Sequence, residues 1–150
     1  MPQSFACLNF HIVFSVKHRQ PEIDPKWEDR LYSIFGGILR ERKGMLLAAG
    51  GVADHVHLLV SLPRDLCVAD AVREIKTASA KWIHETFPER RAFAWQRGYA
   101  AFSTSYSHLD AVRRYLTIQK EHHRRMTFQD EVRELLRAHA LSPDEEHMWE

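Results

Sequence analysis

The stretch Gly50–Pro63, GGVADHVHLLVSLP, decides the fold because its side chains alternate as they do in a β-strand. Alternate residues of a strand project from the same face of a sheet. The alternation predicts a strand over residues 54–62 whose two faces carry different residues: His55, His57 and Leu59 on one, and Val56, Leu58 and Val60 on the other. Burying two histidines is costly unless they share a purpose, so this pair is the first candidate for a functional site.

The segments on either side of this strand predict three further strands and four helices. We expect the other strands at residues 5–16, 45–49 and 93–105, the last bent at Gly98. Apolar residues at helical spacing predict helices at about 25–43, 68–87, 107–125 and from 128 onward.

Local signals predict where these elements begin and turn. Asp24 is the expected N-cap of the first helix, followed by Pro25, and Gly50-Gly51 is the expected hairpin turn. Two capping boxes are expected, one formed by Ser107 with Asp110 and one by Thr127 with Asp130.

The order β-α-β-β-α-β followed by two helices predicts an α+β fold with a ferredoxin-like or RRM-like antiparallel sheet. In that topology the first strand and the 54–62 strand are central, so the histidine pair lies in the middle of the sheet. Two helices cover one face, and the other face is free for a ligand or for the C-terminal helices. We expect one domain over 1–150, comprising a sheet core (1–106), a helix (107–125), and a C-terminal helix with an acidic tail (126–150).

Composition places few limits on function. The chain has 150 residues and a net charge of +1, with no apolar run long enough to span a membrane and no signal-peptide pattern at its start. Cys7 and Cys67 form no disulfide or metal pattern, which suggests reduced thiols in a cytoplasm. Residues 143–150 carry four acids and no Lys or Arg, and between Arg113 and Arg125 five basic residues face one acid. That basic patch fits a nucleic-acid contact or, equally, a solvated helix face.

The His55–His57 pair predicts a metal site, with two half-exposed histidines as the simpler alternative. Imidazoles two residues apart on a strand can converge on one cation. Asp54 could orient one imidazole from behind, as carboxylates do at metal centres, or could simply belong to the turn.

A third ligand is expected from the helix at 107–125. Tyr115 and Gln119 are four residues apart and share a helix face, while His122 and His123 are further candidates. The amide oxygen of Gln119 would favour Mg²⁺ or Mn²⁺.

Together these motifs resemble the single-tyrosine HUH transposases of the smallest bacterial insertion sequences (the IS200-like group) and their REP-associated relatives. The resemblance rests on His55-Val56-His57 followed by a helix with Tyr115-Leu116-Thr117-Ile118-Gln119, and covers about residues 9–125. It also includes FHIVFSVKHRQP, IKTASAKWI and WQRGYAAFSTS as the family's first strand, second helix and fourth strand.

The resemblance implies a function and a role for each residue. Family members cut and rejoin single-stranded DNA through a 5′-phosphotyrosine, which makes Tyr115 the expected nucleophile and His55, His57 and Gln119 the expected Mg²⁺ or Mn²⁺ ligands. It also implies a homodimer that recognises imperfect hairpins, in which the tyrosine helix of one subunit often serves the histidines of the other.

Basic residues near the tyrosine are candidates for binding the DNA backbone. Arg113, Arg114 and Lys120 flank Tyr115, and Lys76 and Lys81 lie on the second helix.

Three alternatives stay open at this stage. The chain could be a domesticated relative acting on scattered repeat hairpins, a non-catalytic RRM-like module for single strands, or a metal-dependent hydrolase without a covalent step. Tyr99 and Tyr106 are weaker nucleophile candidates than Tyr115, because neither has a glutamine one turn later.

Overall fold

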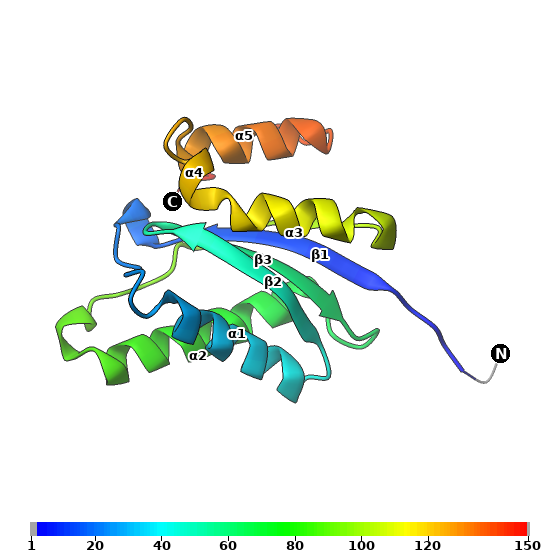
Figure 1. Cartoon of the computed structure of the whole chain (residues 1–150), viewed down its shortest axis with the longest axis horizontal. Helices are drawn as coiled ribbons and strands as arrows, with labels where there is room; N and C mark the ends of the chain where they lie inside the picture. Colours follow the sequence, from blue (N-terminus) through cyan, green and yellow to red (C-terminus); the bar gives the residue numbers. More distant parts are fainter. Residues whose placement is uncertain (1–2, 150) are drawn as a thin grey trace.

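The computed structural model describes residues 3–149, so the first two residues and Glu150 of the expected acidic tail lie outside it (Figure 1). The strands and α-helices follow in chain order: β1 (Leu8–Ser15), α1 (Glu28–Glu41), β2 (Met45–Val52), β3 (His55–Leu62), α2 (Val68–Thr86), β4 (Ala100–Ser103), α3 (Leu109–Thr117), α4 (Gln119–His122) and α5 (Phe128–Ala138). Short 3-10 turns at Lys17–Arg19, Pro88–Arg90 and Tyr106–His108 connect some of them. This order confirms the predicted α+β fold.

The four strands form one antiparallel sheet in the order β2-β3-β1-β4. The two strands predicted to be central, β1 and β3, are central and pair with each other along their whole length. Val13 of β1 lies opposite His57 of β3. The histidine pair is therefore held in the best-supported part of the sheet.

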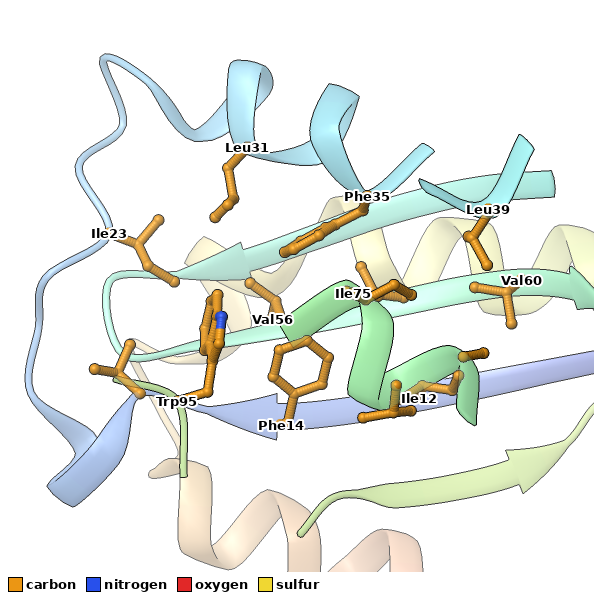
Figure 2. Packing of buried hydrophobic residues seen from close by; sticks show 14 of the residues in the cluster. Ile12, Phe14, Ile23, Leu31, Phe35, Leu39, Val56, Val60, Ile75 and Trp95 are labelled. Carbon is orange, nitrogen blue, oxygen red and sulfur yellow. The ribbon is translucent and has the colours of Figure 1, made fainter. Parts of the chain in front are cut away.

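One face of the sheet is covered by α1 and α2, and this layer holds the main hydrophobic core (Figures 1 and 2). Figure 2 shows Ile12 and Phe14 of β1 meeting Phe35 of α1 and Ile75 of α2. Each such side chain, when fully buried, contributes about 1.5–3 kcal/mol of hydrophobic transfer free energy. The core therefore fixes which faces of β1 and β3 point away from it.

The opposite face of the sheet is covered by α3, α4 and α5 (Figure 1). Leu59 of β3 packs against Leu109 and Leu116 of α3. Val13 and Phe102 of the sheet pack against α5. The C-terminal helices are thus docked on the face that carries the histidines.

The predicted hairpin turn at Gly50-Gly51 is wrong, because both glycines lie inside β2 and the turn is Ala53-Asp54. Gly50 pairs with His57, and a Cβ atom at Gly50 would lie 2.0 Å from the carbonyl oxygen of Leu116. The glycine therefore serves the close approach of α3 to the sheet, a tertiary cause that turn propensity does not reveal.

Two predicted helix starts are also wrong. The Asp24 carboxylate accepts a hydrogen bond from the Lys26 backbone N–H at 2.8 Å and so stabilises a turn, while α1 begins four residues later at Glu28. The Ser107 hydroxyl does not cap α3; it lies 3.2 Å from the Nδ1 atom of His108, within the 3-10 turn that precedes the helix.

The other boundary predictions had mixed outcomes. The single helix expected over 107–125 is divided at Ile118 into α3 and α4. The capping box at Thr127 is confirmed on its N-cap side, because the Asp130 backbone N–H donates to the Thr127 hydroxyl at 3.2 Å. The strand expected over 93–105 is shorter, because β4 spans only Ala100–Ser103, and Gly98, with a φ of 69°, lies just before it. Among residues 3–149, none of the helices is long and apolar enough to cross a membrane.

Candidate active site

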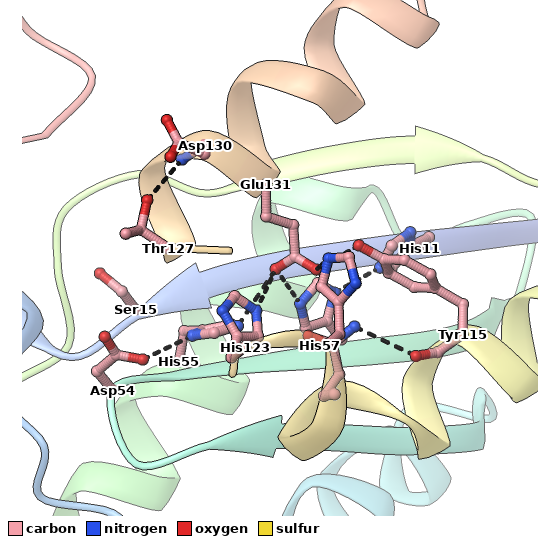
Figure 3. Close-up of polar contacts among 12 residues, drawn as sticks. His11, Ser15, Asp54, His55, His57, Tyr115, His123, Thr127, Asp130 and Glu131 are labelled. Carbon is pink, nitrogen blue, oxygen red and sulfur yellow. Dashed lines mark hydrogen bonds and ion pairs between the residues drawn. The ribbon is translucent and has the colours of Figure 1, made fainter. Parts of the chain in front are cut away.

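His55 and His57 are completely buried and project from the sheet face covered by the C-terminal helices (Figure 3). The predicted alternation is confirmed, because Val56, Leu58 and Val60 enter the main core on the other face. The rings of the two histidines are 5.1 Å apart, centroid to centroid. The pair therefore faces a common interior point, as the metal hypothesis requires.

Glu131 of α5 lies at that point, with 1% of its surface exposed. Its Oε1 atom is 2.9 Å from His57 Nε2, 2.9 Å from His123 Nε2 and 3.3 Å from His55 Nε2. Figure 3 shows Glu131 reaching from α5 into the ring of histidines. One carboxylate thus contacts three imidazoles, two from β3 and one from the C-terminal end of α4.

Sequence reasoning missed Glu131, although a signal for it exists. It shares the apolar face of α5 with Phe128, Val132 and Leu135, where a carboxylate needs buried partners. His123 was only one of several ligand candidates.

His11 of β1 was also missed. It shares its strand face with the buried polar residues Asn9 and Ser15, so three of the four alternate positions 9, 11, 13 and 15 are polar.

The two strand histidines each have a second partner behind the cluster. His55 Nδ1 is 2.7 Å from Asp54 Oδ1, and His57 Nδ1 is 2.8 Å from His11 Nε2. Because a carboxylate can only accept, the Asp54 contact assigns the His55 proton to Nδ1 when that imidazole is neutral. Asp54 therefore lies where it was predicted to lie, behind one imidazole.

Tyr115 of α3 contacts the same cluster within the same chain. Its hydroxyl donates a short hydrogen bond to Glu131 Oε2, and its ring centroid is 5.7 Å from that of His57 (Figure 3). Partial burial is the main cause that raises the pKa of Tyr115 above its usual value of 10, and the hydrogen bond to Glu131 is the second. The phenol is thereby held neutral at one edge of the cluster.

The pKa values in the cluster follow from burial and from these contacts. Burial alone would raise the pKa of Glu131, but contacts with His123, His55 and His57 lower it overall. Burial lowers the pKa of His57 to about 4, against the opposing effect of Glu131. Burial also acts to lower the pKa of His55, yet the hydrogen bond to Asp54 and the nearby carboxylate of Glu131 raise it overall. The cluster therefore contains an ionised carboxylate and at least one neutral imidazole near pH 7.

Gln119 is buried close to Tyr115 but is not among the groups that contact Glu131. Its Nε2 atom donates to the Tyr115 carbonyl at 3.2 Å, and its Oε1 atom is buried without a hydrogen-bond partner. His122 lies at the rim, with Nε2 3.4 Å from Glu131 Oε2. The predicted role of Gln119 as a metal ligand stays a prediction.

The predicted DNA-binding residues divide into two groups. Arg113, Arg114 and Lys120 lie on α3 and α4, the layer that contains Tyr115. Lys76 and Lys81 belong to α2, on the other face of the sheet. The structure therefore brings only the first group near Tyr115.

Lys76 already has a structural environment. Its ammonium donates to the Gln96 carbonyl at 2.9 Å and also to that of Gly98, and burial lowers its pKa to about 8. Lys81 is exposed and lies 3.9 Å from Glu85.

Comparison with known families shows to which family the chain belongs. The family model described as "Transposase IS200 like" matches residues 4–119, which include the histidine pair, Tyr115 and Gln119. The chain belongs to the IS200-like transposase family. The resemblance found from the motifs is thereby confirmed.

Curated relatives of the chain align with it over part of their length. It is 27% identical over 88 residues to the ISDra2 transposase TnpA of Deinococcus radiodurans, which covers 59% of this chain and 63% of the relative. It is also 27% identical over 95 residues to the transposase for insertion sequence element IS200 of Salmonella typhimurium, covering 60% of this chain and 62% of the relative. The chain thus matches a little under two thirds of either relative.

Two solved structures share the fold of the chain. A Deinococcus radiodurans R1 protein assigned as a transposase has a TM-score of 0.64 at 23% identity, covering 75% of this chain and 90% of that one. A REP-associated tyrosine transposase bound to a REP hairpin has a TM-score of 0.54 at 16% identity, covering 76% of this chain and 66% of that one.

Proposed function

We propose that this protein cleaves and rejoins single-stranded DNA through a covalent 5′-phosphotyrosine on Tyr115, with a divalent metal ion held at the histidine cluster. The observation that carries the proposal is the contact of the Tyr115 hydroxyl with a buried cluster of imidazoles and a carboxylate in a chain of this family. A tyrosine whose hydroxyl is hydrogen-bonded to a cluster of potential metal ligands is a candidate nucleophile by its position as well as by its sequence motif.

The covalent step needs no cofactor that stores energy. The Tyr115 oxygen forms a bond to phosphorus, the bond from phosphorus to the 3′ oxygen breaks, and the tyrosine proton ends on that 3′ oxygen. The result is one 5′-phosphotyrosine and one 3′-hydroxyl, and reversal with another 3′-hydroxyl rejoins the strand. Glu131 Oε2 already accepts a hydrogen bond from the Tyr115 hydroxyl. Glu131 therefore orients the phenol and is in position to accept the tyrosine proton.

The residues present fit a divalent ion. His55 Nε2 and Gln119 Oε1 are buried acceptors without hydrogen-bond partners, which suits atoms meant to bind a cation. An ion held by His55 and His57 would neutralise the negative charge that builds up on the scissile phosphate. Arg113 and Arg114, on the helix of the nucleophile, are suited to contact the DNA backbone.

The proposed substrate is single-stranded DNA that folds into imperfect hairpins. The solved relative with a bound REP hairpin supports a hairpin partner for this fold. A homodimer, also implied by the family resemblance, stays a prediction. The domesticated alternative differs in the DNA used rather than in the chemistry, so hairpins from both the gene's flanks and scattered repeats belong in the test.

The test is covalent capture of DNA. Untagged protein is incubated with a divalent ion and labelled single-stranded hairpins, and adducts are detected on a denaturing gel. We expect an adduct with native protein and none with Tyr115→Phe, which loses one hydroxyl at a stability cost of about 0.5–1.5 kcal/mol.

The matched control is Tyr106→Phe, the same chemical change at a tyrosine that is 78% exposed. This variant should form the adduct at the native rate. Adduct formation by Tyr115→Phe would refute the proposal, and DNA cleavage without any adduct would establish the hydrolase alternative. Binding without cleavage under any metal would establish the non-catalytic module.

A further inference from the structure

We infer that four protein donors, His55, His57, His123 and Glu131, form the metal site of this chain, and that it prefers transition ions such as Mn²⁺, Co²⁺ or Zn²⁺ to Mg²⁺. The inference rests on the proposed function for its biological use, but it concerns binding alone. It departs from the ligand set His55, His57 and Gln119 that the sequence predicts.

The unpaired nitrogen of His55 is the first reason. Asp54 Oδ1 accepts a hydrogen bond from His55 Nδ1 at 2.7 Å, so Nε2 is the ring nitrogen that is directed at the cluster. This Nε2 atom lies 3.3 Å from Glu131 Oε1 and has no hydrogen-bond partner. His55 is completely buried, so a cation shared with Glu131 would satisfy a nitrogen that bulk water does not reach.

The spacing of the donor atoms is the second reason. One ligand atom from each of His55, His57, His123 and Glu131 lies within 4.8 Å of all the others. Glu131 Oε1 lies 2.9, 2.9 and 3.3 Å from the three imidazole nitrogens. Two ligands bound at about 2.0–2.1 Å to one ion are roughly 2.9–3.4 Å apart, for angles between octahedral and tetrahedral. The three edges that join Glu131 Oε1 to the imidazole nitrogens therefore already have the lengths found in a coordination shell.

The groups behind the ligands are the third reason. Metal-binding histidines generally use their second nitrogen to bind a carboxylate or another acceptor. His55 does so with Asp54 at 2.7 Å, and His57 is paired with His11 at 2.8 Å. Both strand histidines thus have outer partners that orient the ring, and for His55 the carboxylate partner also sets the tautomer.

The choice of ion follows from the donor types. Mg²⁺ prefers oxygen ligands and retains its water, whereas imidazole suits Zn²⁺, Ni²⁺, Cu²⁺ and iron. Three imidazoles and one carboxylate therefore favour a transition ion. Glu131 would also connect the ion to the nucleophile, since Oε1 faces the imidazoles while Oε2 holds the Tyr115 hydroxyl.

Metal binding by calorimetry tests the site. Untagged native protein is titrated in separate experiments with Mn²⁺, Zn²⁺ and Mg²⁺ at pH 7.5, without DNA. We expect one tight site for Mn²⁺ and Zn²⁺, with Mg²⁺ at least tenfold weaker than either. His123→Ala and Glu131→Gln should each weaken Mn²⁺ and Zn²⁺ binding by about 10–100-fold or more.

His147→Ala is the matched control, because His147 is exposed in the C-terminal segment and outside the cluster. It should bind all three ions as native protein does. Circular dichroism checks that each variant is folded. The absorption spectrum of Co²⁺ bound to native protein gives a readout that needs no variant: intense visible bands of a four-coordinate ion are expected.

Several results would overturn the inference. Unchanged affinity in both ligand variants would exclude His123 and Glu131 as ligands. Tighter binding to Glu131→Gln would show that Glu131 competes with the ion, and a Co²⁺ spectrum like that of the hexaaqua ion would exclude the imidazole set. The two proposals can fail separately. A DNA adduct formed by a protein whose metal binding does not depend on His123 and Glu131 would refute only this inference. Metal binding by the four donors without any DNA adduct would refute only the proposed function.

Discussion

Substituting Gly50 with alanine should misplace the nucleophile without changing a single functional group. Gly50 lies opposite His57 in the sheet, and α3 passes directly over it. An added Cβ would be 2.0 Å from the Leu116 carbonyl oxygen and 2.8 Å from its carbon. Both are backbone atoms next to Tyr115, so the clash cannot be relieved by rotating a side chain.

The size of the effect follows from the geometry. Restoring a Cβ contact of at least 3.0 Å from 2.0 Å requires the Leu116 backbone to withdraw by about 1 Å. Forced backbone shifts of this kind cost about 1–3 kcal/mol of stability. A displacement of about 1 Å at a reacting group can lower a rate by roughly 100-fold. We therefore expect Gly50→Ala to fold, to be less stable, and to form the DNA adduct about 100 times more slowly.

Urea denaturation and single-turnover adduct formation measure the two effects. Gly37→Ala is the matched control: a Cβ there meets only the flexible Arg40 side chain at 3.8 Å, within α1. Replacing a helical glycine with alanine should stabilise the protein by about 0.5–1 kcal/mol and leave the adduct rate unchanged. A Gly50→Ala protein with native stability and native rate would refute the argument that α3 needs this close approach.

Two further predictions follow from the site. Burial lowers the pKa of His11 to about 3. Below about pH 6.5 the unfolded chain therefore binds a proton at His11 that the folded protein does not bind, which favours unfolding. The stability associated with a neutral His11 is complete above pH 6.5 and is lost as the pH falls toward 3. Between pH 7 and 5, the free energy of unfolding of metal-free native protein, measured with urea, should therefore fall faster than that of His11→Asn, by at most about 1.4 kcal/mol per pH unit. Parallel slopes would contradict the assignment. Because Tyr115 contacts the cluster of its own chain, mixing His57→Ala with Tyr115→Phe protein should restore no adduct. Partial recovery after confirmed subunit exchange would instead show sites shared between subunits, the arrangement that the family resemblance implies.

The sheet and the histidine pair could be predicted because they depend on local periodicity. Strand alternation alone places His55 and His57 on one face, and the order of the elements makes β3 central. Thr127 was recognisable as a cap because a capping interaction involves only neighbouring residues.

The errors arose where distant segments decide the local structure. Gly50 signals a turn by composition, but its role is set by Leu116 of α3, which lies more than sixty residues later in the chain. Ser107 matches a capping motif, yet a 3-10 turn precedes α3.

Glu131 could be suspected only as a carboxylate on an apolar helix face. Its partners on β3 are more than seventy residues away, and no spacing rule connects them.

The most direct test of the central claim is to locate the DNA on the protein by mass spectrometry. Trypsin cuts after Arg114 and Lys120, which places Tyr115 in the peptide 115–120, while Tyr99 and Tyr106 share the peptide 98–113. After nuclease treatment of the isolated adduct, the account predicts a 5′-linked nucleotide on peptide 115–120 and nowhere else. A nucleotide on peptide 98–113 or on Tyr32, or cleaved DNA with no modified peptide, would contradict it.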